Sequence, residues 1–289
     1  MDLTAQQVPS SRRLEGEKTP DPRWDGGCTQ EGLVGQSPVM QEIRCKIRRV
    51  APTDATVFLF GETGTGKEVV ARRIHELSDR RAGPFIGVNC GAIAPDLIES
   101  ELFGHERGSF TGAYRSRPGL FAVARRGTLL LDEITEMPQE LQSRLLRVLE
   151  SGRFEPVGGE REQLFEARVL ATTNRRPRQA VSDGRLRDDL FFRLNVFPME
   201  LPPLRERGDD VLLLARHFLE RLNRSEGLEK RFTRAALERI RKHPWPGNVR
   251  QLKNAVQRAF ILADEVIDAR IVLPEPCWNQ PDTGIASSA

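Results

Sequence analysis

One segment constrains the fold of this chain more than any other: a short apolar run passes directly into a glycine-rich loop and then into a helical pattern. The apolar run is Thr56–Phe60. In the helical pattern, Lys67–Ser78, apolar residues recur at i, i+4 and i+7 and so share one face. The loop between them matches G-x4-G-K and consists of Gly61, Glu62, Thr63, Gly64, Thr65, Gly66 and Lys67. This order predicts a phosphate-binding loop that joins a strand to a helix.

The residue types of this loop suit a phosphate group. Glycines let the backbone curl so that successive N–H groups face the phosphate, and the helix N-terminus adds positive potential. The ammonium group of Lys67 would reach the β- and γ-phosphates of a nucleotide. The general pattern continues with Ser or Thr, whose hydroxyl helps to hold Mg²⁺, but this chain has Glu68 at that position. A carboxylate there could bind the ion directly, act through water or point elsewhere.

A second apolar run ends in two carboxylates. Gly127–Asp132 is typical of a buried strand, and Glu133 follows it. At the edge of a sheet that also carries a phosphate loop, Asp132 would orient Mg²⁺ and Glu133 would polarise the attacking water. Such a pair is common at strand ends and is usually just solvated, so the interpretation depends on the phosphate loop. Together the two motifs indicate nucleotide hydrolysis.

The wider pattern predicts two structured units. From Leu33 onward, short apolar runs alternate with helical stretches, as in a protein built on a parallel sheet. Three further candidate strands bring the number to five: Pro84–Asn89, Ala167–Thr173 and Phe197–Leu201. Beyond Pro203 the β-like runs stop, and three helices are expected over Asp209–Arg224, Thr233–His243 and Asn248–Leu262. We therefore expect an α/β domain over residues 31–202 and a helical domain over residues 203–264.

The ends of the chain have a different composition. Residues 1–30 combine Pro, Ser and Gly with charges and few apolar positions, which predicts a disordered leader. Residues 265–289 form a tail with room for a short helix at most and with no evident DNA-binding domain.

Composition excludes several classes of protein. The 41 acidic and 44 basic residues leave a net charge of +3, too small to indicate general attraction to nucleic acid or membranes. Nothing in the chain has the apolar length of a membrane span or the apolar centre of a signal peptide. The four cysteines are scattered, with no C-x-x-C pair and no histidine at zinc-ligand spacing. We expect a reduced, cytoplasmic protein without a metal cluster.

Several further stretches carry a specific resemblance. They are Asn89-Cys90, Glu99–His105, Leu201–Arg207 and Trp245–Arg250. With the phosphate loop, they resemble the AAA+ domain of bacterial enhancer-binding proteins, the sigma-54-dependent transcription activators, over Leu33 to about Leu262. The resemblance implies an AAA+ P-loop NTPase with a five-stranded parallel sheet and a C-terminal helical lid domain. It also implies that Glu68 is a family trait, and that ATP and Mg²⁺ bind to the loop, to Asp132 and to Arg250.

The most telling resemblance is in the loop Gly108-Ser109-Phe110-Thr111-Gly112-Ala113. It is similar to the Gly-Ala-Phe-Thr-Gly-Ala loop with which the family contacts sigma-54. Ser109 stands in place of alanine, whereas Phe110 and Thr111, the residues expected to make the contact, are kept. Glycines at both ends would let the loop fold or extend, and an apolar ring between them suits a docking tip.

The same resemblance assigns roles to single residues. It implies that Asn89 restrains the catalytic Glu133 until the nucleotide state changes, and that Asn174 is a polar sensor near the γ-phosphate. Arg187 and Arg193 resemble arginines that enter the site of a neighbouring subunit, and Arg250 resembles the sensor of the lid. Arginine suits such positions because its planar fork spreads several donors over phosphate oxygens.

The function implied is ATP-driven remodelling of sigma-54 RNA polymerase by a hexameric ring. No sensory or DNA-binding domain is evident, so we expect regulatory or DNA-binding partners in trans, or a longer protein of which this chain is a part. Two alternatives stay open. The chain could be an AAA+ remodeller of another protein, which Ser109 allows, or a non-enzymatic nucleotide-sensing adaptor that assembles with a full-length activator. Lys67, Asp132 and Glu133 argue against the adaptor.

Overall fold

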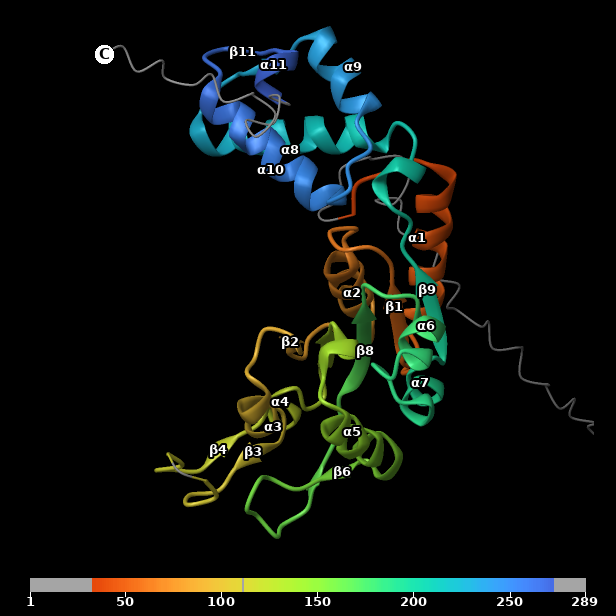
Figure 1. Cartoon of the computed structure of the whole chain (residues 1–289), viewed down its shortest axis with the longest axis vertical. Coiled ribbons are helices and arrows are strands. Elements are labelled where there is room, and N and C mark those ends of the chain that lie inside the picture. The colour runs from red at the N-terminus through yellow and green to blue at the C-terminus, as the bar shows by residue number, and fades with distance from the viewer. Residues whose placement is uncertain (1–32, 111, 273–289) are drawn as a thin grey trace, which may run out of the picture.

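The computed structural model describes residues 33–110 and 112–272 (Figure 1). The predicted leader at 1–30, Thr111 and the part of the predicted tail beyond residue 272 lie outside these ranges. Among the described residues, no helix combines the length and the apolar composition that a membrane span requires.

The five predicted strands form one parallel sheet in the order β2-β5-β8-β1-β9. Their bounds lie within one residue of the prediction: β1 Val57–Phe60, β2 Phe85–Asn89, β5 Thr128–Asp132, β8 Arg168–Thr173 and β9 Phe197–Glu200. The central strands are buried on both faces, so apolar and polar residues do not alternate along them. The predicted α/β domain with a five-stranded parallel sheet is confirmed.

Helices cover both faces of the sheet because alternate residues of each strand point to opposite sides. Val57 and Leu59 pack against helices α1 (Pro38–Val50) and α2 (Lys67–Glu76), whereas Phe58 packs into a second core on the other face. The second core is formed with α3 Pro95–Phe103, α4 Leu120–Val123, α5 Gln139–Ser151, α6 Pro177–Ser182 and α7 Asp188–Leu194. Short elements complete the domain: β3 Gly104–His105, β4 Arg117–Pro118, η2 Ile134–Glu136, β6 Arg153–Phe154 and β7 Gln163–Leu164.

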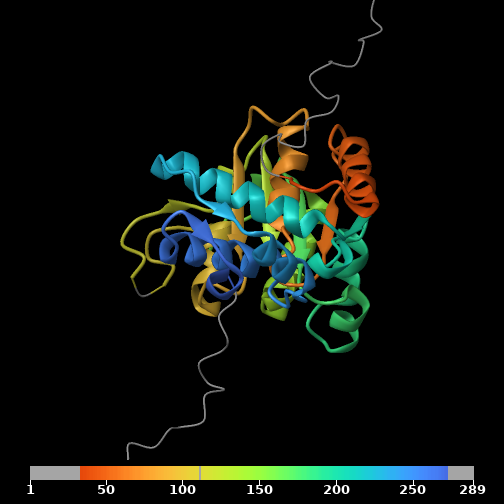
Figure 2. The same cartoon turned by 90° about the horizontal axis from the view of Figure 1, so that it is seen from above.

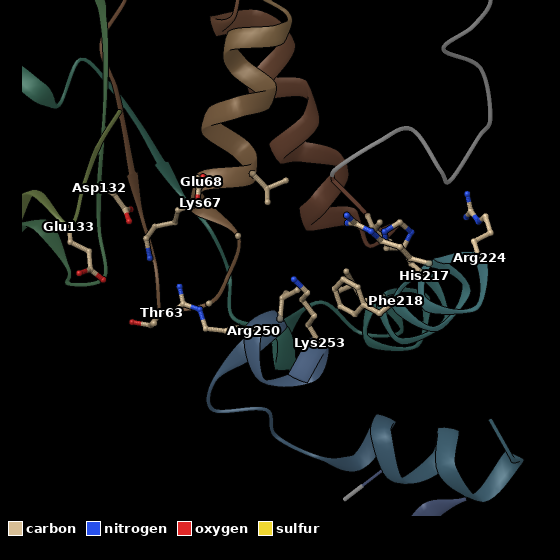
Figure 3. Close-up of a pocket in the computed structure, with 17 residues that line it drawn as sticks. Thr63, Lys67, Glu68, Asp132, Glu133, His217, Phe218, Arg224, Arg250 and Lys253 are labelled. Atoms are coloured by element: carbon tan, nitrogen blue, oxygen red, sulfur yellow. The ribbon is translucent and has the colours of Figure 1, made fainter. Parts of the chain in front are cut away.

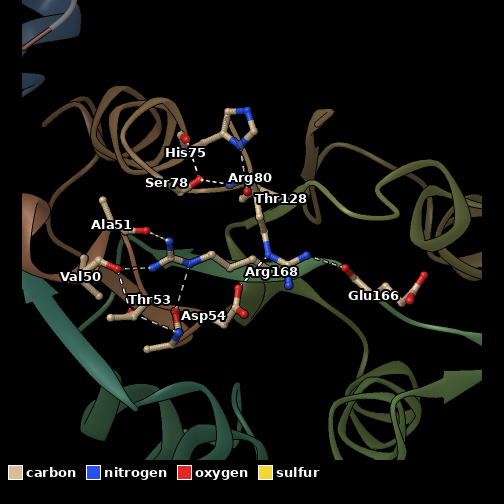
Figure 4. A network of polar contacts seen from close by, with 11 residues as sticks. Val50, Ala51, Thr53, Asp54, His75, Ser78, Arg80, Thr128, Glu166 and Arg168 are labelled. Atoms are coloured by element: carbon tan, nitrogen blue, oxygen red, sulfur yellow. Dashed lines mark hydrogen bonds and ion pairs between the residues drawn. The ribbon is translucent and has the colours of Figure 1, made fainter. Parts of the chain in front are cut away.

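A buried cation fixes the edge of the sheet at which β8 begins. Arg168 is 2% exposed, and its guanidinium donates to the carbonyl oxygens of Val50 (2.8 Å) and Ala51 (2.7 Å) at the end of α1. Burial lowers the pKa of Arg168. Nearby, Arg80 bonds Asp54 (2.8 Å), and its Nη1 donates to the carbonyl of Glu166 (2.7 Å) (Figure 4). These contacts tie α1 and the segment after α2 to the sheet, opposite the edge that carries the phosphate loop.

The lid comprises residues 204–272 and lies over the α/β domain in Figure 2. Its elements are η3 Leu204–Glu206, α8 Asp210–Glu226, β10 Arg231–Phe232, α9 Arg234–Lys242, α10 Asn248–Leu262, β11 Val266–Ile267 and α11 Ala269–Val272. The helices pack around Trp245, which is 1% exposed. This core includes Ile267 and Val272, past the expected end of the domain at residue 264. The parallel pair β10–β11 was not predicted, because two residues are too short to show a period.

Candidate functional site

A cavity of about 780 Å³ lies between the sheet and the lid. Residues of the phosphate loop, including Thr63 and Lys67, line it, together with Asp132 and Glu133 from the end of β5. The lid contributes Arg250, and Figure 3 shows side chains from both domains converging on the cavity. The sheet order places the two carboxylates here because the carboxyl ends of parallel strands meet at one edge.

The phosphate loop has the conformation that its glycines allow. Gly61 has a φ of +148°, and an added Cβ would lie 2.4 Å from the carbonyl oxygen of Leu201, so only glycine fits. The ammonium group of Lys67 donates to the carbonyl oxygens of Gly61 (2.7 Å) and Glu62 (3.2 Å). Burial lowers the pKa of Lys67, and the nearby charges of Asp132 and Glu133 act in the opposite direction. Two carbonyl groups of the loop therefore hold the Lys67 cation near the carboxylates of Asp132 and Glu133.

Glu68, the departure from the general pattern, points to the surface of α2. Its side chain is 66% exposed at the rim of the cavity and pairs with Arg72 one helical turn later (3.5 Å). Because Glu68 also lines the cavity, its relation to the ion stays a prediction.

Asp132 is held from both neighbouring strands. Asn89 at the end of β2 donates to its Oδ2 (3.1 Å), and the hydroxyl of Thr172 in β8 donates to its Oδ1. The same hydroxyl accepts from the backbone N–H of Glu133 (3.2 Å). Sequence reasoning missed Thr172, whose only signal was a polar residue near the end of an apolar run. Its buried hydroxyl fixes both carboxylate residues relative to the sheet.

Glu133 has a left-handed backbone, with φ 56° and ψ 48°. A non-glycine residue in this region carries strain of about 1 kcal/mol or more, and such residues cluster at functional sites. Its Oε2 lies close to the turn at Gly91, where an added Cβ would be 3.3 Å from it. The hydrogen bonds of the Asn89 side chain join it to Asp132 and to the N–H of Gly91 (2.9 Å), so the restraint of Glu133 by Asn89 stays a prediction.

Three other residues assigned by resemblance are not among the residues that line the cavity. Asn174 is exposed directly after β8. Arg187 pairs with Asp189 (2.7 Å) at the start of α7, and the exposed Arg193 donates to the carbonyl of Leu149. Neither arginine is among the residues that line the cavity of its own chain. Their roles stay predictions.

The lid wall of the cavity is strongly basic. Besides the predicted Arg250, it carries Arg221 and Arg224 from α8 and Lys253 from α10. Lys253 stands one helical turn after Arg250, a spacing that places both side chains on one face. A cavity lined by this many cations attracts a polyanion.

The loop at 108–113 lies on a separate projection between β3 and β4, which Figure 1 shows at the end of the α/β domain away from the lid. Gly108 and Gly112 have φ values of +86° and +110°, and the Gly108 N–H donates to the carbonyl of Ala113 (2.9 Å). Phe110 is 39% exposed, with its ring packed edge-on against His105 at a centroid distance of 5.1 Å. Thr111 lies outside the described residues.

Ser109, the neighbour of Phe110 in the loop, is half-buried. An added Cβ on Gly158 would be 2.5 Å from the Cβ of Ser109, so the serine packs closely on the turn after β6. Within the described residues, its buried hydroxyl has no hydrogen-bond partner. The small side chain fills a position where a larger one would displace the turn.

Fold and cavity define a P-loop nucleotide-binding protein with a helical lid. Residues 33–200 match the model of the Sigma-54 interaction domain, and residues 205–286 match that of the AAA+ ATPase lid domain. The chain therefore belongs to the AAA+ domains of sigma-54-dependent transcription activators, which confirms the resemblance seen in the sequence.

Individual relatives agree with this assignment. The DNA-binding transcriptional regulator NtrC of Rhizobium meliloti (strain 1021) is 48% identical over 265 residues, which are 90% of this chain and 54% of that protein. The Nif-specific regulatory protein of Klebsiella pneumoniae is 42% identical over 289 residues, 100% of this chain and 55% of that protein. The chain thus spans about half the length of the curated relatives it matches.

Solved structures also match most of this chain. The crystal structure of NtrX from Brucella abortus in complex with ADP has a TM-score of 0.78 and 37% identity, and covers 86% of this chain and 56% of its own. The structure of NtrX in complex with ATP matches with the same TM-score and identity.

Proposed function

We propose that this chain hydrolyses ATP in the cavity between sheet and lid, and that it uses the cycle to remodel sigma-54 RNA polymerase at a promoter. The observation that carries the proposal is the placement of Lys67, Asp132 and Glu133 on one cavity, with the Phe110 loop on a projection of its own. ATP hydrolysis and contact with sigma-54 would then occur at separate places in one protein.

The nucleotide would bind through its phosphates. Backbone N–H groups of the phosphate loop and the ammonium of Lys67 would hold them from the sheet side, and Arg250 would approach from the lid. Asp132 fits Mg²⁺, because a hard cation takes oxygen ligands and both oxygens of this carboxylate are fixed by Asn89 and Thr172. The ion would neutralise charge on the phosphates.

Glu133 would act as the general base. It accepts a proton from water while the water oxygen bonds to the γ-phosphorus, and the bond from that phosphorus to the β–γ bridging oxygen breaks to release ADP. The buried Thr172 hydroxyl supports this role, since it fixes the backbone of Glu133 beside the strand end. Asn174, exposed directly after β8, would sense the γ-phosphate from the same edge of the sheet.

The proposed assembly is a hexameric ring of this chain. Arg187 and Arg193 lie outside their own cavity, which supports a role in the site of a neighbouring subunit. An arginine supplied in trans stabilises the charge of the transition state. The tips of the Phe110 loops would contact sigma-54, and regulatory or DNA-binding functions would come from partners or from further parts of a longer protein.

The test is ATP turnover measured over a range of protein concentrations, with and without sigma-54. The proposal predicts specific activity that rises with concentration and changes when sigma-54 is added. A Glu133→Gln chain, expected to bind ATP without turnover, is the control for a contaminating ATPase. Turnover that is independent of concentration and of sigma-54 would favour the remodelling of another protein.

A further inference from the structure

Three consecutive carbonyl groups of the phosphate loop accept hydrogen bonds from outside the α/β domain. All three donors lie in or at the start of the lid, far away in the sequence. The pairs are Asn248 Nδ2 to Thr63 O (3.0 Å), Val249 N to Gly64 O (3.0 Å) and Arg207 Nη2 to Thr65 O (2.7 Å). Each of these three loop carbonyls is therefore hydrogen-bonded to the lid.

Asn248 is the centre of this contact. It is fully buried at the start of α10 and has a left-handed backbone with a φ of 53°. Its Oδ1 accepts from the N–H of Leu204 (2.7 Å), and its Nδ2 donates to Glu62 Oε2 (3.0 Å) as well as to the carbonyl of Thr63 (3.0 Å). One amide thus joins the phosphate loop, the lid helix α10 and η3 at the start of the lid.

Arg207, directly after η3 at the start of the lid, also holds the loop. It is 3% exposed, and its guanidinium donates to the carbonyls of Thr65 (2.7 Å) and Pro202 (2.8 and 3.1 Å). Burial lowers the pKa of Arg207 to about 10. An arginine buried against carbonyl groups loses its hydration. Hydrogen bonds of good geometry must offset that cost.

The loop and the lid touch without room for a side chain. An added Cβ on Gly64 would lie 2.5 Å from the carbonyl oxygen of Gly247 and 3.0 Å from the Cβ of Arg250. The backbone of the loop therefore rests directly on the first turn of α10, the turn that carries Arg250 into the cavity.

We infer that Asn248 and Arg207 are positioning residues that couple the shape of the phosphate loop to the position of the lid. The C=O and N–H of a planar trans peptide point in opposite directions. Holding the carbonyls of Thr63 and Thr65 from the lid side therefore turns the N–H groups of Gly64 and Gly66 away from the lid donors, and both glycines line the cavity.

The inference rests on the proposed function, because it concerns the binding of ATP and ADP in this cavity. Its consequence is reciprocal: a lid that holds the loop strengthens nucleotide binding, and a bound nucleotide strengthens the closure of the lid. The alternative is a domain contact that only stabilises the fold.

Variants of Asn248 and Glu62 separate the coupling of loop and lid from a contact that only stabilises the fold. Asn248→Asp keeps the shape of the side chain but removes its donors and sets a second carboxylate beside Glu62, so the Kd for ADP should rise by about tenfold, as when a hydrogen bond to a charged group is lost. Adding Glu62→Gln to the same chain restores an amide–carboxylate pair, but a carboxylate at position 248 still cannot donate to the carbonyl of Thr63. Because that donor stays absent, the double variant should bind ADP as weakly as Asn248→Asp alone, to within about threefold.

Two further variants make the test decisive. Asn248→Gly suits the left-handed backbone, removes the amide without adding charge, and should also weaken ADP binding. Arg241→Ala is the matched control, since Arg241 pairs with Asp209 on the exposed surface of the lid (3.0 Å) and should leave the Kd unchanged. The readouts are calorimetric ADP binding and the melting temperature of each chain.

Asn248→Asp and Asn248→Gly chains that bind ADP like the parent, even with lowered melting temperatures, would overturn the inference. So would a Glu62→Gln/Asn248→Asp chain that binds ADP as tightly as the parent, since it still lacks the donor to the Thr63 carbonyl. If the parent itself failed to bind ADP, the proposed function would fall instead, and the two failures are therefore distinct.

Discussion

The charged side chains around the cavity differ in what holds them. Asp132 is fixed by a hydrogen bond to each of its oxygens, and Lys67 by two loop carbonyls. Glu133 is placed by a strained backbone and by the N–H bond to Thr172. The lysine is therefore suited to binding phosphate and the glutamate to a chemical step.

These roles predict different defects for two substitutions. Lys67→Ala removes the cation of the phosphate loop, so ATP binding should weaken by at least about tenfold. Glu133→Gln should keep ATP binding within a few-fold of the parent and lower turnover by about a hundredfold or more, because only the proton acceptor is lost. Nucleotide titration and phosphate release measure the two effects. An equal loss of ATP binding in both chains would refute the assignment.

Glu62 predicts a pH dependence of stability. The hydrogen bond from Arg205, followed by that from Asn248, lowers the pKa of Glu62 from 4.5 to about 2. Because the folded-state pKa is depressed, its contribution to the free energy of unfolding is present above pH 4.5 and is lost as the pH falls towards 2. The side chain is 42% exposed, so solvent screening keeps the contribution modest.

Comparison with Glu62→Gln isolates this contribution from the other carboxylates. In denaturant titrations, the parent should be more stable than the variant near neutral pH, and the difference should shrink as the pH falls from 4.5 towards 2. A difference that stays constant over this range would contradict the prediction.

Thr172 shows why part of the site could not be predicted. Lys67, Asp132 and Glu133 were found because each belongs to a local pattern of known chemistry. Thr172 meets Asp132 only because β8 lies beside β5 in the sheet, and a threonine in an apolar run carries no sign of that neighbour.

The strands and helices were predicted where burial leaves a clear pattern. Each of the five strands of the sheet contains a short apolar segment that the sequence shows, and α10 has the predicted bounds Asn248–Leu262. The pair β10–β11 could not be predicted, because two-residue strands are too short to show a period. The contact of Ser109 with Gly158 could not be predicted either, because it joins a loop to a turn about fifty residues away.

Ser109 allows a prediction about the projecting loop. Its hydroxyl is buried and, among the described residues, unpaired, so Ser109→Ala should leave the free energy of unfolding unchanged or raise it by up to about 1 kcal/mol. Basal ATP turnover should not change. Ser116 offers a matched control, because its hydroxyl donates to Glu106 (2.6 Å) and accepts from the N–H of Arg107 (3.1 Å).

Ser116→Ala should therefore lose about 0.5–1 kcal/mol of unfolding free energy, measured with the Ser109 variant by chemical denaturation. A loss of more than about 1 kcal/mol in Ser109→Ala would reveal an unrecognised partner of its hydroxyl.

In the whole molecule, the contacts that matter most join segments far apart in the chain. Asn248 and Thr63 are 185 positions apart, and only the folded structure brings the lid onto the phosphate loop. Periodicity and motifs predicted both domains but could not show which backbone groups of one meet the other.

The proposed ring predicts complementation between two inactive chains. Arg193→Ala lacks a residue proposed to act in the neighbour's site, and such a loss can lower turnover by about a thousandfold. Glu133→Gln lacks the general base but keeps both arginines. In a mixture, the Arg193→Ala chain should supply intact Glu133 bases and the Glu133→Gln chain should supply intact arginines. Turnover of the mixture should therefore exceed that of either chain alone. No gain at any mixing ratio, with assembly verified by scattering, would count against action across subunits.

The central claim is that ATP hydrolysis is coupled to sigma-54 through the projecting loop. Phe110→Ala should keep basal ATP turnover within a few-fold of the parent, because the loop lies on a projection outside the nucleotide cavity. Leu164→Ala is the matched control, since Leu164 is an exposed apolar residue on β7 with no proposed contact.

The most direct measurement is binding of each chain to sigma-54 in the presence of ADP and a transition-state mimic of the γ-phosphate. The account predicts a stable complex with the parent and with Leu164→Ala, and none with Phe110→Ala. A Phe110→Ala chain that binds sigma-54 as tightly as the parent would contradict it.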